Sequence, residues 1–430
     1  MCGLLCHSEG ARNGLPGVSG QARATDLGLF GARDAATDIG EAVQFGDRLA
    51  LRMEVLGSVN GHGCQCILTQ YACQLMLTNW RCQNRRMLTP PKLVPGDRVA
   101  ILSPAFAAPA VAPELHEQAL GRLMELTGLI PVEYPTTRQL DASPEARAAD
   151  VNAAYADPGI RAILATIGGD DQILVVPHLD AALARADPKP FVGYSDNTNL
   201  LNWLWNLGIP GFYGGSTAVH LGPGPAVDDA HLRSLRAALL DGDELELTEP
   251  GESEDVGKRW EDPRALTEYG DRIPTEPWTW AGPQARVEGR TWGGCLEVID
   301  QLALAGRLPE PDALAGAILL IETSEERPPA SWVGRWMRGL GERGILSAVA
   351  GVVVARPPVS DFEFQPSVAE ADALRAAQRD IIIKTIARYK PDAVVCVGPP
   401  FGHTRPQWIV PYGGRMILDG AAQKVFADYS

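Results

Sequence analysis

The chain has 430 residues, of which 45% are hydrophobic and 21% charged, a composition typical of soluble globular proteins. This length predicts two or three domains with substantial hydrophobic cores. The formal net charge of −15 argues against a nucleic-acid polymer or an anionic membrane as a partner. No apolar stretch is long enough to span a bilayer and no secretory signal is readable, so we expect a cytoplasmic protein.

Residues 1–86 differ from the rest of the chain. They show little sustained helical or strand periodicity, and they contain six of the eight cysteines. The candidate zinc ligands in this region are His62, Cys64, Cys66, Cys73 and Cys82. The Cys-x-Cys spacing departs from the usual zinc pattern, so we expect no metal site here. We interpret residues 1–86 as a disordered tail or an over-extended reading frame that precedes Met87, with a small accessory domain as the alternative.

Strands and helices alternate regularly through residues 87–240. Apolar runs predict strands at 98–103, 130–134, 161–167, 190–194 and 209–213. Helical spacing and capping residues predict helices at 113–127, from Ser143 onward, at 172–185 and at 197–207. Short connections between alternating elements predict a mostly parallel sheet with helices on both faces, and therefore an α/β fold.

The remaining chain divides into two parts. Residues 241–284 are rich in Glu, Asp, Pro and Trp without a clear period, which indicates a linker or a long loop over a site. Residues 285–430 form the second predicted domain. One helix is expected after Trp292-Gly293-Gly294 and through Leu304, and two more at 331–343 and 368–389. The expected strands are 317–321, 348–355 and 393–398. The tail 408–428 is predicted to be a hairpin containing Tyr412-Gly413-Gly414.

A serine follows the fourth predicted strand, within Gly193-Tyr194-Ser195-Asp196. A strand–turn–helix corner exposes such a side chain and directs helix N-terminal N–H groups at an incoming oxyanion. The motif is not the full G-x-S-x-G elbow, because Asn197 occupies the last glycine position. The alternative role for Ser195 is therefore a helix N-cap.

Two further polar residues follow buried strands in the second domain. Glu322 ends an apolar run, where a carboxylate usually has a partner. His403 follows a Gly/Pro-rich loop, and His220 in a similar loop is the competing candidate base. Serine, carboxylate and histidine at strand ends together predict a Ser-Glu-His triad assembled across two domains.

The turn Gly168-Gly169-Asp170-Asp171 also ends a predicted strand at a helix start. Its glycine N–H groups could complete an oxyanion hole, and a plain turn with an Asp cap is the alternative. No His or third carboxylate lies near the acidic pair, so we expect no metal there. Hydrolysis by a triad needs no organic cofactor, and we expect none. Cys295 and Cys396 are alternative nucleophiles without a glycine-flanked elbow. A catalytically inactive two-domain binding protein is a further alternative.

Five segments together resemble the LD-carboxypeptidase family of serine peptidases, from about Leu88 to the C-terminus. These segments are 166–171, 193–198, 288–294, 320–324 and 401–403. The resemblance implies a Rossmann- or flavodoxin-like N-terminal domain, a partly β-barrel-like C-terminal α/β domain, an active site at their interface, and a homodimer. The residues that it implies are the triad Ser195, Glu322 and His403 and the oxyanion donors Gly168, Gly169 and Asp196.

Departures from the family pattern bear on the substrate. Members that trim murein tetrapeptides typically have Gly-Gly-Tyr-Gly where this chain has Gly-Gly-Asp-Asp, and the acidic insertion here carries tryptophans. Both features are similar to the microcin C self-immunity branch, which cleaves an amide bond between an aminoacyl or peptidyl group and a nucleotide. We therefore expect an aminoacyl- or peptidyl-nucleotide substrate, with a murein tetrapeptide as the alternative. The expected substrate-binding residues are Asp170, Trp260 and Trp292. Cys295 stands where the family commonly has Asn.

Overall fold

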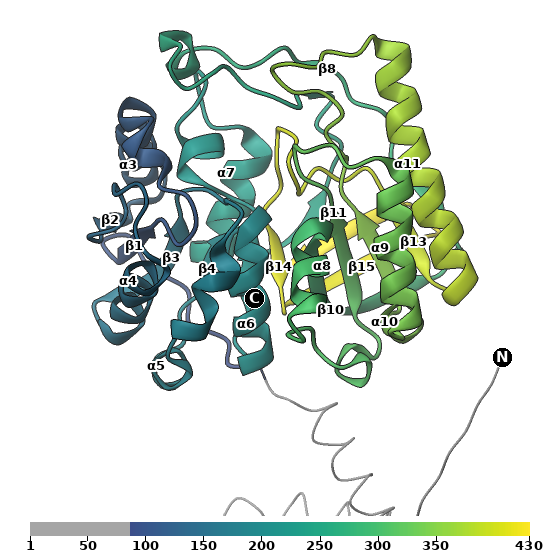
Figure 1. Ribbon diagram of the computed structural model, residues 1–430, viewed down its shortest axis with the longest axis horizontal. Coiled ribbons are helices and arrows are strands. Elements are labelled where there is room, and N and C mark those ends of the chain that lie inside the picture. The colour runs from purple at the N-terminus through teal and green to yellow at the C-terminus, as the bar shows by residue number, and fades with distance from the viewer. Residues whose placement is uncertain (1–86) are drawn as a thin grey trace, which may run out of the picture. The chain divides into compact units, whose positions relative to one another are not determined.

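The computed structural model describes residues 87–430, which build two large β-sheets and one two-stranded sheet, with helices packed around the large ones (Figure 1). One large sheet has six strands and the other has eight. No helix within the described residues is long and apolar enough to cross a membrane. The mixed α/β architecture confirms the predicted fold class.

The first sheet has the strand order β14-β5-β4-β3-β1-β2. Its first five strands along the chain are mutually parallel, in the 2-1-3-4-5 order of flavodoxin-like folds. Their bounds are β1 Arg98–Leu102, β2 Ile130–Glu133, β3 Ile160–Ala165, β4 Phe191–Gly193 and β5 Gly211–Tyr213. β1 and β3 are almost wholly buried, which explains their continuous apolar sequences.

Helices cover this sheet, and two of them illustrate how local sequence determines their bounds. α3 buries Leu115, Ala119 and Leu123, which are spaced four residues apart and so share one face. α4 begins where the Ser143 hydroxyl accepts a hydrogen bond from the N–H of Ala146. The helices of this part are α3 Pro113–Thr127, α4 Pro144–Ala156, α5 Ala181–Ala186, α6 Thr198–Leu207 and α7 Asp229–Arg236.

The single helix predicted over 172–185 is wrong. The chain instead forms two 3₁₀ turns, Gln172–Leu174 and Val176–His178, before α5 begins. Pro177 lacks the N–H that a continuous helix needs at that position. The Asp180 carboxylate then accepts hydrogen bonds from Ala182 and Leu183 and caps the new helix.

The second sheet is mixed, with the order β6-β16-β15-β10-β11-β12-β13-β9. Strands β10 to β13 are parallel, and the strands next to them on both sides are antiparallel. The strands are β6 Glu244–Leu247, β9 Thr279–Ala281, β10 Arg286–Cys295, β11 Ile318–Glu322, β12 Gly351–Val354, β13 Val394–Val397, β15 Arg415–Asp419 and β16 Lys424–Asp428. β10 is longer than the short motif around Trp292 suggested.

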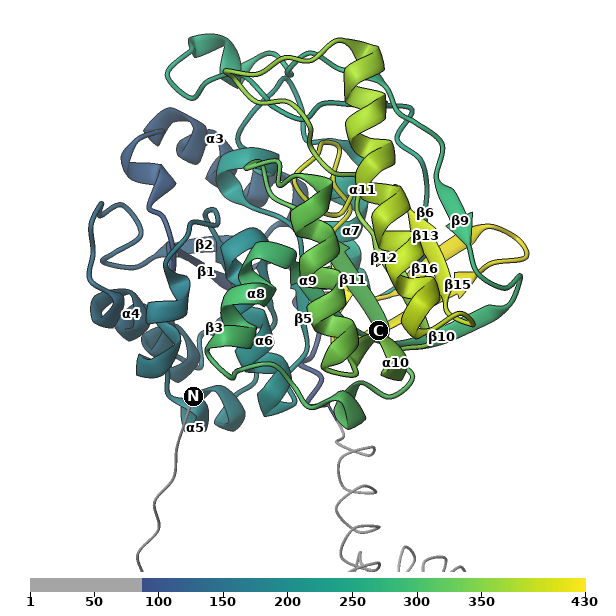
Figure 2. The same cartoon turned by 45° about the vertical axis from the view of Figure 1, so that its right-hand side comes forward.

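Helices lie along one side of the second sheet, as both views show (Figures 1 and 2). α11 packs against α9, and α8 contacts β10 and also α6 of the first sheet's layer. α11 has the bounds that the sequence predicted. The helices are α8 Leu296–Leu304, α9 Ala330–Glu342, α10 Ile345–Ala348 and α11 Val368–Tyr389.

Residues 241–284 contain short strands although their sequence shows no clear period. β6 and β9 form the two edges of the second sheet, while β7 Glu252–Ser253 and β8 Ile273–Pro274 pair with each other. Buried ion pairs hold this segment in place: Asp255 lies 2.6 Å from Arg356 and 2.9 Å from Arg375. β8 and its neighbouring loops lie at the top of Figure 1.

The tail crosses between the two sheets. β14, Val410–Tyr412, pairs antiparallel with β5 of the first sheet, and β15 and β16 then form a hairpin in the second. The prediction of one hairpin around Tyr412-Gly413-Gly414 is therefore wrong, because that glycine pair carries the chain from one sheet to the other. Gly413 has φ 83°, a conformation that an L side chain would strain.

Candidate active site

Ser195 occupies a strained corner directly after β4. Its φ is 63°, and within the described residues only four non-glycine residues have positive φ. The corner is held by the Thr198 hydroxyl, which donates to the Ser195 carbonyl at 2.7 Å, and by the Ser195 N–H, which donates to Tyr213 Oη at 3.2 Å. A serine at such a sharp strand-to-helix turn resembles the nucleophile elbow of α/β-hydrolases, although the flanking glycine pattern differs.

His403 lies between Ser195 and Glu322. Its Nε2 is 2.9 Å from Ser195 Oγ, and its Nδ1 is 2.6 Å from Glu322 Oε2. The histidine side chain is 8% exposed and the glutamate side chain 0%. Ser195 precedes Glu322 by 127 positions and His403 by 208, yet hydrogen bonds join the three side chains. Ser195 follows β4, Glu322 ends β11, and His403 lies on the loop that follows β13. This is the spatial arrangement that a Ser-His-acid triad requires.

Tyr213 is a site residue that sequence reasoning missed. Its hydroxyl donates to Glu322 Oε1 at 2.6 Å and accepts from the Ser195 N–H. The residue ends β5 and precedes a Gly-Gly pair, so its place at a strand end was a readable signal. The buried carboxylate of Glu322 therefore has a partner on each oxygen, which offsets the cost of removing it from water.

The charge of the imidazole is set by nearby carboxylates. Burial alone would lower the pKa of His403, but Glu322 and Glu325 outweigh it and raise that pKa to about 9. Glu325 Oε2 lies 3.1 Å from Nε2, the nitrogen that also faces Ser195. The sequence interpretation treated Glu325 as a solvated loop residue, so this contact was missed.

The Gly168-Gly169 turn packs directly against the serine. A Cβ added at Gly168 would lie 2.8 Å from Ser195 Cβ and 2.9 Å from Ser195 Oγ, so only glycine fits without displacement. A Cβ at Gly169 would lie 2.9 Å from Ala105 Cβ. The turn, the serine and the start of the following helix are therefore brought together, as an oxyanion hole would need.

The acidic residues around this turn have different surroundings. Asp196 is 1% exposed, and its carboxylate accepts from the Gln172 N–H and the Asn199 amide, while burial raises its pKa to about 6. Asp171 forms a two-pronged ion pair with Arg147 at 2.7 and 2.8 Å. Asp170 is exposed. Of the acidic pair, Asp171 is thus held by a protein partner and Asp170 faces solvent.

The two tryptophans expected to bind substrate lie in apolar surroundings. Trp292 is 1% exposed and its indole N–H donates to Asn202 at 3.1 Å. Its ring therefore packs between β10 and α6, where we had expected it to contact substrate. Trp260 is half-buried and packs beside Ala112 and Leu115. Part of its ring therefore remains accessible.

His220, Cys295 and Cys396, the alternative candidates for base and nucleophile, are buried in a way that keeps their side chains uncharged. His220 stacks on His231 with ring centroids 4.8 Å apart, and burial holds the pKa of His220 well below its usual value. Such a ring stays neutral and is not hydrogen-bonded to Ser195. Burial likewise raises the pKa of the Cys295 and Cys396 thiols well above the usual value, so neither is present as a thiolate nucleophile.

Metal ligands were expected neither at the triad nor near the N-terminus. Within residues 87–430, no group of three or more His, Cys, Asp or Glu side chains is arranged to hold a metal ion. The candidate ligands His62, Cys64, Cys66, Cys73 and Cys82 lie outside the described residues.

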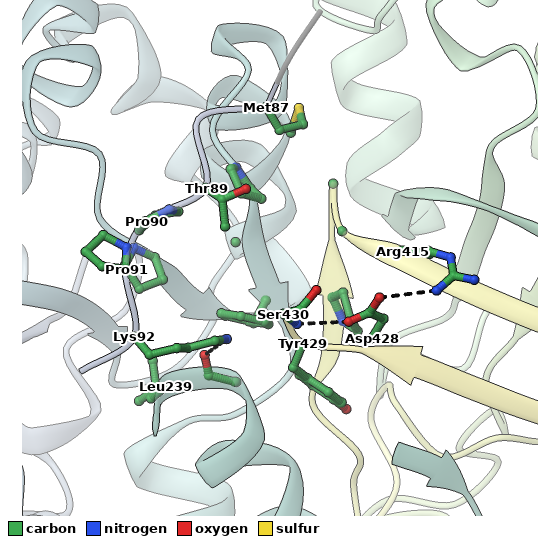
Figure 3. A pocket seen from close by; sticks show the side chains of 18 of the residues that line it. Met87, Thr89, Pro90, Pro91, Lys92, Leu239, Arg415, Asp428, Tyr429 and Ser430 are labelled. Carbon is green, nitrogen blue, oxygen red and sulfur yellow. Dashed lines mark hydrogen bonds and ion pairs between the residues drawn. The ribbon is translucent and has the colours of Figure 1, made fainter. Parts of the chain in front are cut away.

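The pocket drawn in Figure 3 lies away from the triad. It has a volume of about 390 Å³ and is lined at the amino ends of the parallel strands, by Lys92, Pro190 and Gly211 among others. The Lys92 ammonium donates to the carbonyls of Ala237 and Ala238, and burial lowers the pKa of Lys92 to about 8. Ser195 lies beyond the opposite, carboxyl end of β4 in the same sheet, so the pocket and the triad are separate sites.

The chain is similar to proteins named as carboxypeptidases. A Vibrio cholerae protein named as an inferred carboxypeptidase is 27% identical over 330 residues, which are 75% of this chain and 92% of the relative. The murein tetrapeptide carboxypeptidase of Pseudomonas aeruginosa is 29% identical over 236 residues, 52% of this chain and 66% of the relative. The microcin C7 self-immunity protein MccF of Escherichia coli is 25% identical over 279 residues, 65% of this chain and 75% of MccF.

Solved structures and family models agree with this relationship. Structures of MccF in complex with glutamyl sulfamoyl guanosine and with aspartyl sulfamoyl adenosine share the fold, with a TM-score of 0.68 and 22% identity. The match covers 79% of this chain and 98% of MccF. Residues 99–214 match the model of the LD-carboxypeptidase N-terminal domain, and residues 288–418 match that of the C-terminal domain. The chain therefore belongs to the LD-carboxypeptidase family.

Proposed function

We propose that this protein is a serine-type hydrolase that cleaves an amide bond by a triad of Ser195, His403 and Glu322. The observation that carries the proposal is the hydrogen-bonded chain from Ser195 Oγ through both ring nitrogens to Glu322, at 2.9 and 2.6 Å. The strained corner at Ser195 supports the nucleophile role, because such a conformation persists only where the surrounding structure holds it.

The proposed reaction begins when unprotonated Nε2 of His403 removes the Ser195 proton and Oγ attacks the substrate carbonyl. Glu322 holds Nδ1–H and stabilises the imidazolium, as the acid of a triad does. The N–H groups of Gly169 and Asp196, beside Gly168, bind the oxyanion. His403 then gives the proton to the leaving amine, and water activated by the same imidazole hydrolyses the acyl-enzyme. Neither a metal nor an organic cofactor enters these steps.

For the substrate we propose an aminoacyl- or peptidyl-nucleotide, cleaved at the amide that joins the acyl group to the nucleotide. The similarity to MccF, whose complexes contain aminoacyl sulfamoyl nucleosides, supports this class. Exposed Asp170 and half-buried Trp260 are the proposed contacts outside the triad. An indole face can stack on a nucleobase, which gives Trp260 a defined role to test.

A murein tetrapeptide is the second candidate substrate. It is favoured by the 29% identity to the murein tetrapeptide carboxypeptidase of Pseudomonas aeruginosa. The same triad chemistry would then release a C-terminal D-amino acid in place of a nucleotide amine. The homodimer implied by the family resemblance stays a prediction, to be tested by light scattering of the purified chain.

A paired assay tests the proposal. The full chain is incubated with an aminoacyl sulfamoyl adenosine and, separately, with an L,D-linked murein tetrapeptide, and released amino acid is quantified. Release from the adenosine compound supports the nucleotide substrate, and release of D-Ala supports the murein substrate. A fluorophosphonate probe labels an activated serine whatever the substrate is, with Ser195→Ala as the unlabelled control. Absence of labelling together with absence of turnover would overturn the hydrolase proposal.

A further inference from the structure

Glu325 is a carboxylate at the reaction centre that the triad chemistry does not use. Its Oε2 contacts His403 Nε2 at 3.1 Å, and the same nitrogen contacts Ser195 Oγ at 2.9 Å. The Glu325 side chain is 64% exposed, in contrast to the fully buried Glu322 on the other ring nitrogen. A substrate entering from solvent therefore meets Glu325 beside the nucleophile.

The contact opposes the first catalytic step. The Glu325 carboxylate lies at ion-pair distance from Nε2, 3.1 Å, and its negative charge favours the protonated imidazole. Removal of the Ser195 proton needs Nε2 without a proton. The raised pKa of His403, to about 9, follows from the same group of carboxylates. Ser195 therefore becomes a better nucleophile when Glu325 pairs with another donor and Nε2 loses its proton.

The surrounding charges favour a cation as that donor. Among the described residues, the charges that most affect the imidazole are the carboxylates of Glu322, Glu325 and Glu297. Arg405 also lies near this region, but it is 4% exposed and paired with Asp228 and Glu254, each at 3.4 Å. A cationic group of the substrate can therefore supply a positive charge for Glu325.

Distance restricts where that charge can be on the substrate. An attacked carbonyl carbon lies about 3–3.5 Å from the nucleophile, and an α-ammonium group is two bonds from that carbon. Because both Glu325 Oε2 and Ser195 Oγ contact His403 Nε2, the two oxygens lie within about 6 Å of each other. An α-ammonium group beside the attacked carbonyl is then close enough to Glu325 to form a hydrogen bond with it. We propose that Glu325 binds the free α-ammonium group of the amino acid whose carbonyl Ser195 attacks, and thereby frees Nε2 of His403.

This inference rests on the proposed function and narrows its substrate class. It selects aminoacyl groups with an unblocked α-amine over peptidyl or N-acylated groups. Glu325 is then a specificity-determining residue that couples recognition of the ammonium group to activation of the base. A blocked substrate would leave Glu325 on His403 and the imidazole protonated.

The test compares alanyl sulfamoyl adenosine with its N-acetyl derivative. The alanine side chain is uncharged, so the two compounds differ in charge only at the α-amine. Values of kcat/KM are measured for the wild type, Glu325→Gln and the matched control Glu326→Gln. Glu326 is the exposed neighbouring glutamate, and no contact of its carboxylate with His403 is present. Wild type and Glu326→Gln should prefer the free amine by about 10- to 100-fold, the size of a charged hydrogen bond. Glu325→Gln should lose most of that preference.

Calorimetric binding in a Ser195→Ala background provides a readout without turnover. Adding Glu325→Gln should weaken binding of the alanyl compound and leave the N-acetyl compound nearly unchanged. Equal cleavage of both compounds by the wild type, or a preference retained by Glu325→Gln, would overturn the inference while the proposed function stands. Absence of both cleavage and binding with either compound would instead overturn the nucleotide substrate, and this inference with it.

Discussion

The hydroxyl of Tyr213 donates to Glu322 Oε1 at 2.6 Å, and this bond joins the end of β5 in the first sheet to the end of β11 in the second. The same hydroxyl accepts the Ser195 N–H at 3.2 Å. One phenol therefore contacts both the backbone of the proposed nucleophile and the proposed triad acid, which come from different sheets. A change in the relative position of the two sheets would therefore change the distance between Ser195 and Glu322.

Replacing Tyr213 with Phe should lower kcat about 10- to 100-fold, because Glu322 loses a charged hydrogen bond that fixes its orientation. The matched control is Tyr412→Phe. Tyr412 is also buried and stacks on Tyr213, but its hydroxyl donates to the Gly293 carbonyl. Both variants should lose similar thermal stability, while only Tyr213→Phe loses activity. Equal loss of activity in the two variants would remove the special role of Tyr213.

Two substitutions at Ser195 should separate catalysis from backbone strain. Both Ser195→Ala and Ser195→Gly should reduce turnover by more than about 10⁴-fold, as loss of a triad nucleophile does. Only glycine relieves the strain of φ 63°, which is about 1 kcal/mol for a non-glycine residue. We therefore expect the glycine variant to melt higher than the alanine variant in differential scanning calorimetry. A lower melting temperature for the glycine variant would contradict the strain argument.

A methyl group at Gly168 should impair catalysis without unfolding the protein. Its Cβ would lie 2.8 Å from Ser195 Cβ, so the turn or the serine must move. Misplacement by about 1 Å can cost about 100-fold in rate, and we expect a fall in kcat of that order for Gly168→Ala. The control is Gly339→Ala, on the exposed face of α9 with open space around it, which should keep full activity. Normal kcat in Gly168→Ala would show that this close contact is not needed.

The reactivity of Ser195 should rise with pH. A general base works unprotonated, and the pKa of His403 is raised to about 9, so most imidazole is protonated at neutral pH in the free protein. The second-order rate of fluorophosphonate labelling should therefore increase from pH 6, reach half of its maximum near pH 9 and level off only above that pH. Glu325→Gln removes one of the charges that raise this pKa, and its profile should move to lower pH, whereas Glu326→Gln should follow the wild type. A flat profile between pH 6 and 9 would contradict the raised pKa.

Much of the fold could be predicted because local sequence determines it. α3 has regular apolar spacing, Pro113 at its start and left-handed Gly128 at its end, and α11 begins at the Ser367–Glu370 capping box. The parallel strands follow from continuous apolar runs. The break of the 172–185 helix was readable in Pro177 and Asp180, but the apolar periodicity concealed it. Ser195, Glu322 and His403 were candidates because each follows or ends a predicted strand. In parallel sheets, functional side chains lie at the carboxyl ends of the strands.

The remaining features depend on contacts between distant segments. Glu325 lies three residues beyond a buried strand and its sequence gives no sign that it turns back onto His403. The role of Tyr213 requires the second sheet to be in place, and Trp292 is buried only because α6 packs over β10. Such pairings are set by tertiary packing, which no window of local sequence contains.

The crossing of the tail has a consequence for how the protein is made. Strand β5 pairs on one side with β14, whose residues Val410–Tyr412 lie about two hundred positions later in the chain. While the chain emerges from the ribosome, the edge of β5 stays without this partner until residues 410–412 have been synthesised. His403 also emerges late. Catalytic competence should therefore be absent from any chain that stops before His403, and a truncation after residue 409 should yield a protein with an open sheet edge prone to self-association.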